Sequence, residues 1–328
     1  MLKKQRLNDV NIYQKNKQDG AKKRASSFWT TKKNQKKLLM SDAADMYIDY
    51  LINTKNSSPK TIENYQFWIW KAIEYFNDPY IEDIKLIDIL QYRKDLAKRE
   101  LSKKTINYYI IALRSFFKFL LKHDIDCISP EKIEIAKIPR TPVNFLTEDE
   151  ISVLLTMPQR HTNDPLLRAR DEVILHILYG SGLRVSELIW LKRDQYIIWE
   201  KQFSIVGKWW KLRSVFFRKE ALEKLNKYLV WREDDYDPLI ISLSKNSYGH
   251  SLSRNTIEAI VKKYANLAGI EKKVTPHTLR HTYATMLLKN WADIRSVQAL
   301  LGHSSIVTTQ IYTHVDDKFL KHVHDLLD

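Results

Sequence analysis

Glycine and cysteine are both scarce in this chain. Its 328 residues include seven glycines and one cysteine. So few glycines favour a largely helical protein, because tight turns usually require glycine. The single Cys127 excludes an intramolecular disulfide and any zinc site built from several cysteines. Four of the seven glycines lie within a few residues of the charged positions discussed below, at Gly180, Gly182, Gly207 and Gly302.

Long apolar runs are also missing. No stretch approaches the roughly 20 apolar residues that span a bilayer. The amino terminus has no apolar core of the kind found in signal peptides. We therefore expect a protein that stays in the cytoplasm and does not contact a membrane.

Acidic residues are in the minority, with 39 Asp and Glu against 54 Lys and Arg, a formal net charge of +15. This balance favours a polyanionic partner, nucleic acid before membrane. Much of the excess lies at the amino terminus, where residues 1–40 hold 12 Lys and Arg and two Asp. Residues 1–38 have no sustained apolar period, which predicts a disordered basic arm. The arm is either a solvated tail or a grip on DNA phosphates.

Helical periodicity begins after this arm. Four segments with apolar residues at helical spacing predict a four-helix domain over residues 39–125. The last of them, at about 102–122, has one apolar face, made of Ile106, Ile110, Leu113, Phe117 and Leu120. A linker over residues 126–143 follows, because Pro139 and Pro142 break helices and keep the chain extended.

A second domain is expected over residues 144–328. It opens with Thr147 and Glu150, which form the capping box of a helix. Beyond two more helices come three short strand candidates, "QYIIW", "QFSIVG" and "LRSVFF", and the remainder is helical. The patterns together predict a mainly α protein with a small antiparallel β-sheet.

The stretch "TPHTLRHTYAT" concentrates positive, proton-carrying groups at a helix start. His277 and His281 stand four residues apart, as zinc ligands on a helix do. Arg280 beside them argues against a metal, because a permanent positive charge next to a divalent cation is costly. The motif also has no Cys or Glu to complete a metal site. Arginine with histidine instead suits a phosphate group.

Two further motifs contain phosphate-binding residue types. In "YGSGLRVSEL", Arg184 follows a glycine turn at a helix start, and Glu187 lies one turn further on the same face. In "LLGHSS", His303 follows Gly302, which suits the left-handed end of a helix. Tyr312 stands nine residues after His303, in "TTQIYTH".

This ordered set resembles the tyrosine recombinases, also called phage-type integrases, and especially the Xer-like members. The similarity covers about residues 41–328. It implies a SAM-like core-binding domain of four helices and a mixed α/β catalytic domain ending in an exchange helix. It also implies a site-specific recombinase that cleaves and rejoins duplex DNA through a 3′-phosphotyrosyl intermediate. No metal, ATP or other cofactor is expected.

The resemblance assigns roles residue by residue. It makes Arg184 and Arg280 a phosphate clamp, with His277 and His303 completing the pocket and Tyr312 as the nucleophile. These roles fit the residue types, because arginines can stabilise the charge that develops on a phosphate under attack. A histidine can accept the proton of the phenol, and a lysine can protonate the leaving 5′ oxygen.

The catalytic lysine of the family falls on Lys208, in "IVGKWWKLR". Two tryptophans follow it, where family members more often have small or polar residues. Because the chain departs from the family at this hairpin tip, Lys211 is a rival for the role. Glu187 and His281 are expected to support the pocket without taking part in the chemistry.

Two alternatives share parts of this pattern. A type IB topoisomerase uses similar chemistry as a monomer, and a DNA-binding protein could carry the basic residues without catalysis. The complete set of polar site residues weighs against the second alternative. The carboxyl-terminal stretch "DDKFLKHVHDLLD" weighs against the first, because its apolar stripe suits a groove on a neighbouring protomer. We therefore expect a homotetramer holding two DNA sites, engaged in dimer resolution, integration or excision, or inversion.

Overall fold

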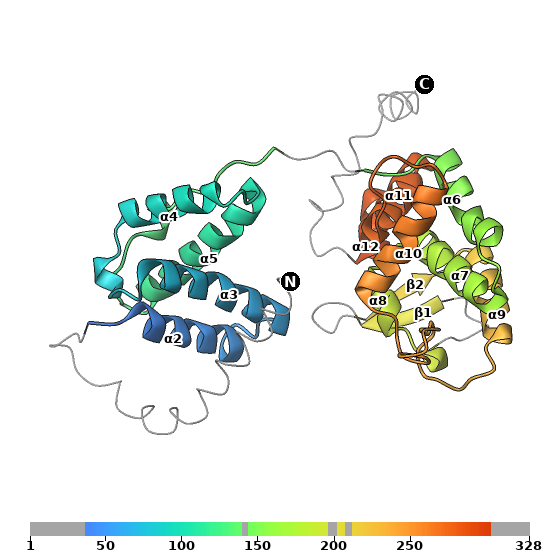
Figure 1. Ribbon diagram of the computed structural model, residues 1–328, viewed down its shortest axis with the longest axis horizontal. Helices are drawn as coiled ribbons and strands as arrows, with labels where there is room; N and C mark the ends of the chain where they lie inside the picture. Colours follow the sequence, from blue (N-terminus) through green and yellow to red (C-terminus); the bar gives the residue numbers. More distant parts are fainter. Residues whose placement is uncertain (1–36, 140–143, 196–201, 207–211, 303–328) are drawn as a thin grey trace. The chain divides into compact units, whose positions relative to one another are not determined.

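The computed structural model describes residues 37–139, 144–195, 202–206 and 212–302, with the backbone alone for 202–206 and 212–213. The chain divides into two compact units, residues 1–140 and 141–328. Helices dominate both units (Figure 1), as the sequence predicts. Among the described residues, no helix is long and apolar enough to cross a membrane.

The described part of unit 1 contains four α-helices, α2 (Met40–Asn53), α3 (Pro59–Phe76), α4 (Leu86–Lys98) and α5 (Lys103–Lys122). Ser58 and Ser102 each accept a hydrogen bond from the backbone N–H three residues later, which fixes where α3 and α5 begin. Helix α2 begins at Met40, and the hydroxyl of Ser41 in its first turn donates to Asp78 at 2.8 Å.

The core of unit 1 forms around α5. The apolar face predicted for this helix is buried along its whole length, and α2, α3 and α4 all pack against the helix (Figure 1). The chain that follows α5 stays on this unit. Ile133 is buried in the same core, and the Asn107 side chain bonds both the N–H and the carbonyl of Ala136. Contacts to unit 1 thus extend well into the stretch expected to act as a linker.

The described helices of unit 2 are α6 (Glu148–His161), α7 (Pro165–Ser181), α8 (Val185–Trp190), α9 (Lys219–Trp231), α10 (Arg254–Leu267), α11 (Pro276–Lys289) and α12 (Ile294–Leu301). The predicted capping box is present at the start of α6, with Thr147 and Glu150 bonding each other's backbone N–H. Helix α7 runs through the centre and packs against α6, α9 and α11.

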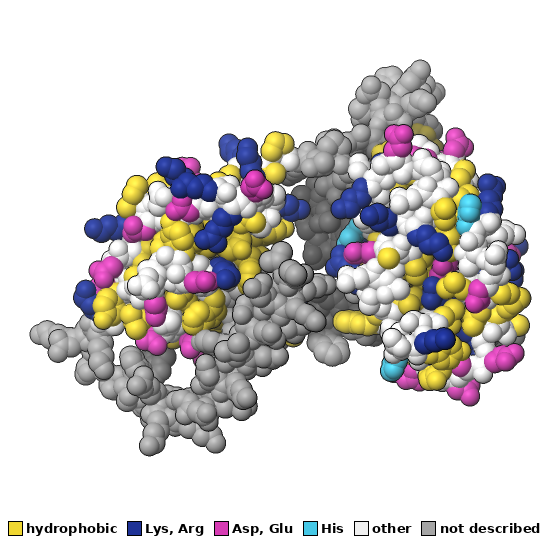
Figure 2. All heavy atoms as spheres, in the orientation of Figure 1, with side chains coloured by type: hydrophobic (Ala, Val, Ile, Leu, Met, Phe, Trp, Pro, Cys, Tyr) yellow, Lys and Arg dark blue, Asp and Glu magenta, His cyan; other side chains and the backbone are white. Residues whose placement is uncertain are grey.

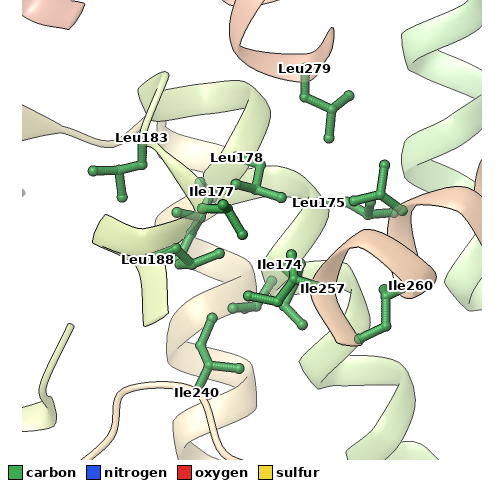
Figure 3. Close-up of a cluster of buried hydrophobic side chains, with 14 of the residues drawn as sticks. Ile174, Leu175, Ile177, Leu178, Leu183, Leu188, Ile240, Ile257, Ile260 and Leu279 are labelled. Atoms are coloured by element: carbon green, nitrogen blue, oxygen red, sulfur yellow. The ribbon is translucent and has the colours of Figure 1, made fainter. Parts of the chain in front are cut away.

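The middle of helix α7 is buried because neighbouring helices surround it. Val173, Ile174, Leu175, Ile177 and Leu178 are each fully buried, and Figure 3 shows several of them with side chains from α8, α10 and α11. The carboxyl end of α7 is also buried, at Gly180 and Ser181. The candidate site begins at that end.

Two strands complete the described part of unit 2. Strand β1 (Gln202–Val206) pairs antiparallel with β2 (Leu212–Phe216), with Gln202 opposite Phe216 and Val206 opposite Leu212. These are the second and third of the predicted strands. Of the first, Gln195 closes a 3-10 turn (Arg193–Gln195), and its other residues lie outside the described ranges. Val215 and Phe217 are buried in the core and anchor the base of this hairpin.

Candidate active site

The site starts where α7 ends in a left-handed residue. Gly182 has a φ of 62°, and a Cβ atom there would lie 2.5 Å from the Tyr283 ring and 3.0 Å from Leu301. Only glycine fits, for both backbone and steric reasons. The turn directs the chain from α7 into α8 within three residues, so that Arg184 immediately precedes the first residue of α8.

Arg184 is held by one carboxylate and one carbonyl. Its Nη1 donates to Glu187 Oε1 at 2.8 Å, and its Nη2 donates to the Gly302 carbonyl at 3.0 Å. The other Glu187 oxygen accepts the Arg184 backbone N–H at 2.7 Å. Glu187 thus fixes both the main chain and the guanidinium of the same residue. The Arg184 side chain still keeps 35% of its surface exposed, which leaves it accessible to a ligand.

Arg280 lies deeper in the protein. Its side chain is 3% exposed, and it donates to the Gly182 carbonyl at 2.5 Å and to the Leu301 carbonyl at 2.6 Å. Its Nη1 also lies 4.0 Å from a Glu187 oxygen. These carbonyls belong to the ends of α7 and α12, where helix dipoles are negative and favour a cation. The arrangement brings two guanidinium groups together around one carboxylate.

The histidines lie on the same helix as Arg280. Thr275 caps α11 and Pro276 occupies its first position, as the sequence predicts. His277 is exposed, and its ring centroid lies 6.3 Å from that of His281. Partial desolvation, followed by the charges of Arg280, Arg254 and Arg184, lowers the pKa of His277.

His281 is more enclosed than His277. Desolvation, together with His277 and Arg280, lowers its pKa to about 4. The lowered pKa of each residue favours the neutral imidazole at pH 7. A neutral imidazole can accept a proton, which an imidazolium cannot do.

The structure thus brings Arg184, Glu187 and Arg280 into contact and sets His277 and His281 on the helix that supplies Arg280. In the view of Figure 2, Lys and Arg side chains are spread over the visible face of unit 2, among acidic and hydrophobic ones. The other predicted site residues lie outside the described ranges, namely Lys208, Lys211, His303 and Tyr312.

Sequence patterns did not reveal the main-chain acceptors of the site. The carbonyls of Gly182, Leu301 and Gly302 hold the two guanidinium groups, and any residue type has such a carbonyl. The two glycines were the sequence feature that could have indicated these acceptors, because Gly182 and Gly302 both end helices with positive φ. Such glycines expose the last carbonyls of the helix at a turn.

In the described ranges, no group of three or more His, Cys, Asp or Glu side chains is placed to hold a metal ion. After desolvation, the positive charge of Arg280 is among the causes that lower the pKa of both His277 and His281.

Two family models match the chain. Residues 144–318, more than half of the chain, match the model of the phage integrase family. Residues 44–124 match the phage integrase N-terminal SAM-like domain.

The relatives carry recombinase names. Tyrosine recombinase XerD of Chlorobaculum tepidum is 35% identical over 85% of this chain and 94% of its own length. Tyrosine recombinase XerA of Pyrococcus horikoshii is 36% identical over 88% of this chain and 94% of its own length.

A solved structure shares the fold. The XerH site-specific recombinase, in its post-cleavage complex with palindromic difH substrate, matches 87% of this chain and 84% of its own, with a TM-score of 0.67 and 24% identity. The chain therefore belongs to the phage integrase family and is a tyrosine recombinase, an enzyme that breaks and rejoins DNA at specific sites.

Proposed function

We propose that Tyr312 attacks the scissile phosphodiester while Arg184 and Arg280 bind its non-bridging oxygens. The phenolic oxygen forms a bond to phosphorus, and the bond from phosphorus to the 5′ oxygen breaks. The products are a 3′-phosphotyrosyl enzyme and a free 5′-hydroxyl. Because the phosphodiester energy is retained in the new bond, attack by another 5′-hydroxyl reverses the step. The step as written needs neither a metal nor ATP.

The arrangement of the two arginines is the observation that carries this proposal. Helix-end carbonyls accept hydrogen bonds from both guanidinium groups. Arg184 also donates to Glu187, and Arg280 lies 4.0 Å from a Glu187 oxygen. A charge stabiliser that is oriented before the reaction has no reorganisation cost when charge develops on the phosphate. The exposed part of Arg184 provides the access that a DNA phosphate requires.

Proton transfers complete the proposed mechanism. A histidine, His277 or His303, accepts the phenol proton, and the lowered pKa of His277 favours the neutral form that this role requires. Lys208 protonates the leaving 5′ oxygen, with Lys211 as the alternative. Glu187 orients Arg184 by its bidentate contact, and His281 supports the pocket from the next turn of α11.

The working assembly we propose is a homotetramer on two duplex DNA sites in the cytoplasm. The apolar stripe of the carboxyl-terminal stretch is the sequence feature that supports exchange between protomers. For the biological role we favour Xer-type resolution of chromosome dimers, because the relatives carry Xer names. Integration or excision of a mobile element is the alternative. Sequencing DNA trapped covalently on the protein in cells distinguishes the two roles.

A nicked suicide DNA substrate tests the catalytic proposal. The protein should become covalently attached to this DNA, and Tyr312→Phe should abolish attachment while leaving DNA binding nearly intact. Attachment that persists in the variant reassigns the nucleophile. A protein that binds DNA but never attaches supports the non-catalytic alternative. Relaxation of a plasmid without recombination between two sites supports the topoisomerase alternative.

A further inference from the structure

We propose that Arg218 is a positioning residue, which holds the base of the β1–β2 hairpin against the end of α7. In this way it sets the general-acid lysine in register with the arginine pocket. The inference rests on the proposed function, because Lys208 belongs to the segment that joins the two strands. Arg218 itself lies two residues after β2 and immediately before α9.

Close packing on a glycine joins Arg218 to α7. The Cγ, Cβ and Cδ atoms of Arg218 lie 3.3, 3.4 and 3.4 Å from the place where a Cβ of Gly180 would stand. The aliphatic stem of the arginine therefore occupies the space that a side chain would fill. Gly180 itself is buried, and it stands two residues before Gly182, the residue that binds Arg280. The contact thus reaches the last turn of α7, beside the arginine pocket.

Two further contacts fix the charged end of Arg218. Its Cζ lies 5.3 Å from the centre of the Tyr179 ring, a cation–π arrangement. Its Nε lies 3.4 Å from a carboxylate oxygen of Glu220. The side chain is nevertheless 50% exposed, so its replacement leaves little buried space. The contacts restrain the position of Arg218 more than they contribute to the core.

The hairpin depends on contacts at its base, which include packing of β2 against α12. Strands β1 and β2 form a two-stranded sheet within the described ranges, and isolated two-stranded hairpins are marginally stable. Val215 and Phe217 bury one side of its base, whereas Phe216 is 51% exposed. Arg218 continues this anchor from the strand to α7.

The arginine pocket does not depend on Arg218 in the same way. Arg184 and Arg280 have their own contacts with Glu187 and with helix-end carbonyls. Removal of the Arg218 side chain should therefore displace the hairpin more than the pocket. A displacement near 1 Å at a reacting group can reduce the rate about 100-fold. The defect should appear in the protonation of the leaving group and not in the stabilisation of phosphate charge.

A pair of DNA substrates separates these two effects. One is the normal suicide substrate, and the other carries a 5′-bridging phosphorothiolate, whose sulfur leaves without a proton. Arg218→Ala should cleave the normal substrate about 10- to 100-fold more slowly. It should cleave the sulfur substrate at nearly the rate of the unchanged protein. Arg218→Lys keeps the stem that packs on Gly180 and should retain most of the normal rate.

Lys219→Ala is the matched control. It removes the same charge from the next position, where the lysine side chain is 89% exposed and forms only a long ion pair with Glu223. This variant should cleave both substrates normally. Equal weakening of DNA binding in Arg218→Ala and Lys219→Ala, with no selective loss of cleavage, would make Arg218 a phosphate contact and overturn the inference. A defect that persists with the sulfur substrate would also overturn it.

Lys208→Ala separates this inference from the proposed function. If the sulfur substrate fails to rescue Lys208→Ala, the proposed role of Lys208 is wrong. If it rescues Lys208→Ala but not Arg218→Ala, the general acid stands and the positioning role is wrong. Rescue of both variants supports the complete inference.

Discussion

Arg184→Ala and Arg280→Ala should impair catalysis alike but differ in stability. Each variant removes one stabiliser of the charge on the attacked phosphate. Removal of such a group typically costs about 3 kcal/mol, or a 10²- to 10³-fold lower rate. The two side chains occupy different surroundings, however, with exposed fractions of 35% and 3%.

The difference in the free energy of unfolding follows from the acceptors left behind. Arg280→Ala leaves two carbonyls, of Gly182 and Leu301, without their guanidinium donor in the interior. Each unpaired buried acceptor costs about 1–3 kcal/mol, so the variant should lose roughly 2–6 kcal/mol. Arg184→Ala leaves the Glu187 carboxylate and the Gly302 carbonyl without their guanidinium donor. These two bonds are only partly buried, unlike those of Arg280. Water can satisfy these acceptors, and the expected loss is about 1 kcal/mol.

Two measurements test this contrast. Urea unfolding, followed by circular dichroism, gives the free energy for each variant. Covalent attachment to suicide DNA, at a temperature where both variants are folded, gives the rate. A folded variant of either arginine that cleaves at a near-normal rate would refute the clamp. Equal destabilisation of the two variants would refute the assignment of Arg280 as the buried member.

Three other predictions concern the lysines, the arm and pH. Lys208→Ala should cleave normal DNA slowly, and the 5′-bridging phosphorothiolate substrate should restore its cleavage rate. Any cleavage defect of Lys211→Ala should persist with the sulfur substrate. Rescue of Lys211→Ala alone would exchange the roles of the two lysines. Deletion of residues 1–38 should weaken DNA binding without moving the cleavage position. The slope of log affinity against log salt should become shallower by about 0.9 for each DNA phosphate that the arm neutralises in the full chain. An unchanged slope would leave the arm without a role in binding. Burial above all lowers the pKa of His176 and of His281 to about 4 each. Because the unfolded chain binds these protons near pH 6.5, stability is full above that pH and falls as pH drops toward 4, by up to about 2 kcal/mol for each histidine at pH 5. Urea titrations at pH 7 and 5 measure the loss, and an unchanged pH dependence in His176→Gln would contradict the contribution of that residue.

Local patterns predicted much of the helical structure. The apolar face of α5 follows from its helical period, and the start of α6 follows from Thr147. The bond from Ser41 to Asp78 has no such local signal, because the two residues are distant in sequence. A local rule cannot foresee a partner that the fold supplies.

The sequence by itself determined the enzyme class, because residue types at fixed spacing carry chemistry. Arg184, the motif "HTLRH" and the order of the motifs after it identified the family without any coordinates. Side-chain chemistry and helical period are properties of short segments, so they can be read from the chain alone.

Only the tertiary structure decided how the two arginines are held. Their acceptors are main-chain carbonyls at the ends of α7 and α12, and Arg280 bonds one from each of these helices. The packing of Arg218 on Gly180 likewise joins residues 38 positions apart in the sequence. Every residue has a carbonyl and every glycine lacks a side chain, so neither marks a partner in the sequence. The partner is selected by the folding of the helices around α7, which brings distant backbone atoms within hydrogen-bonding distance.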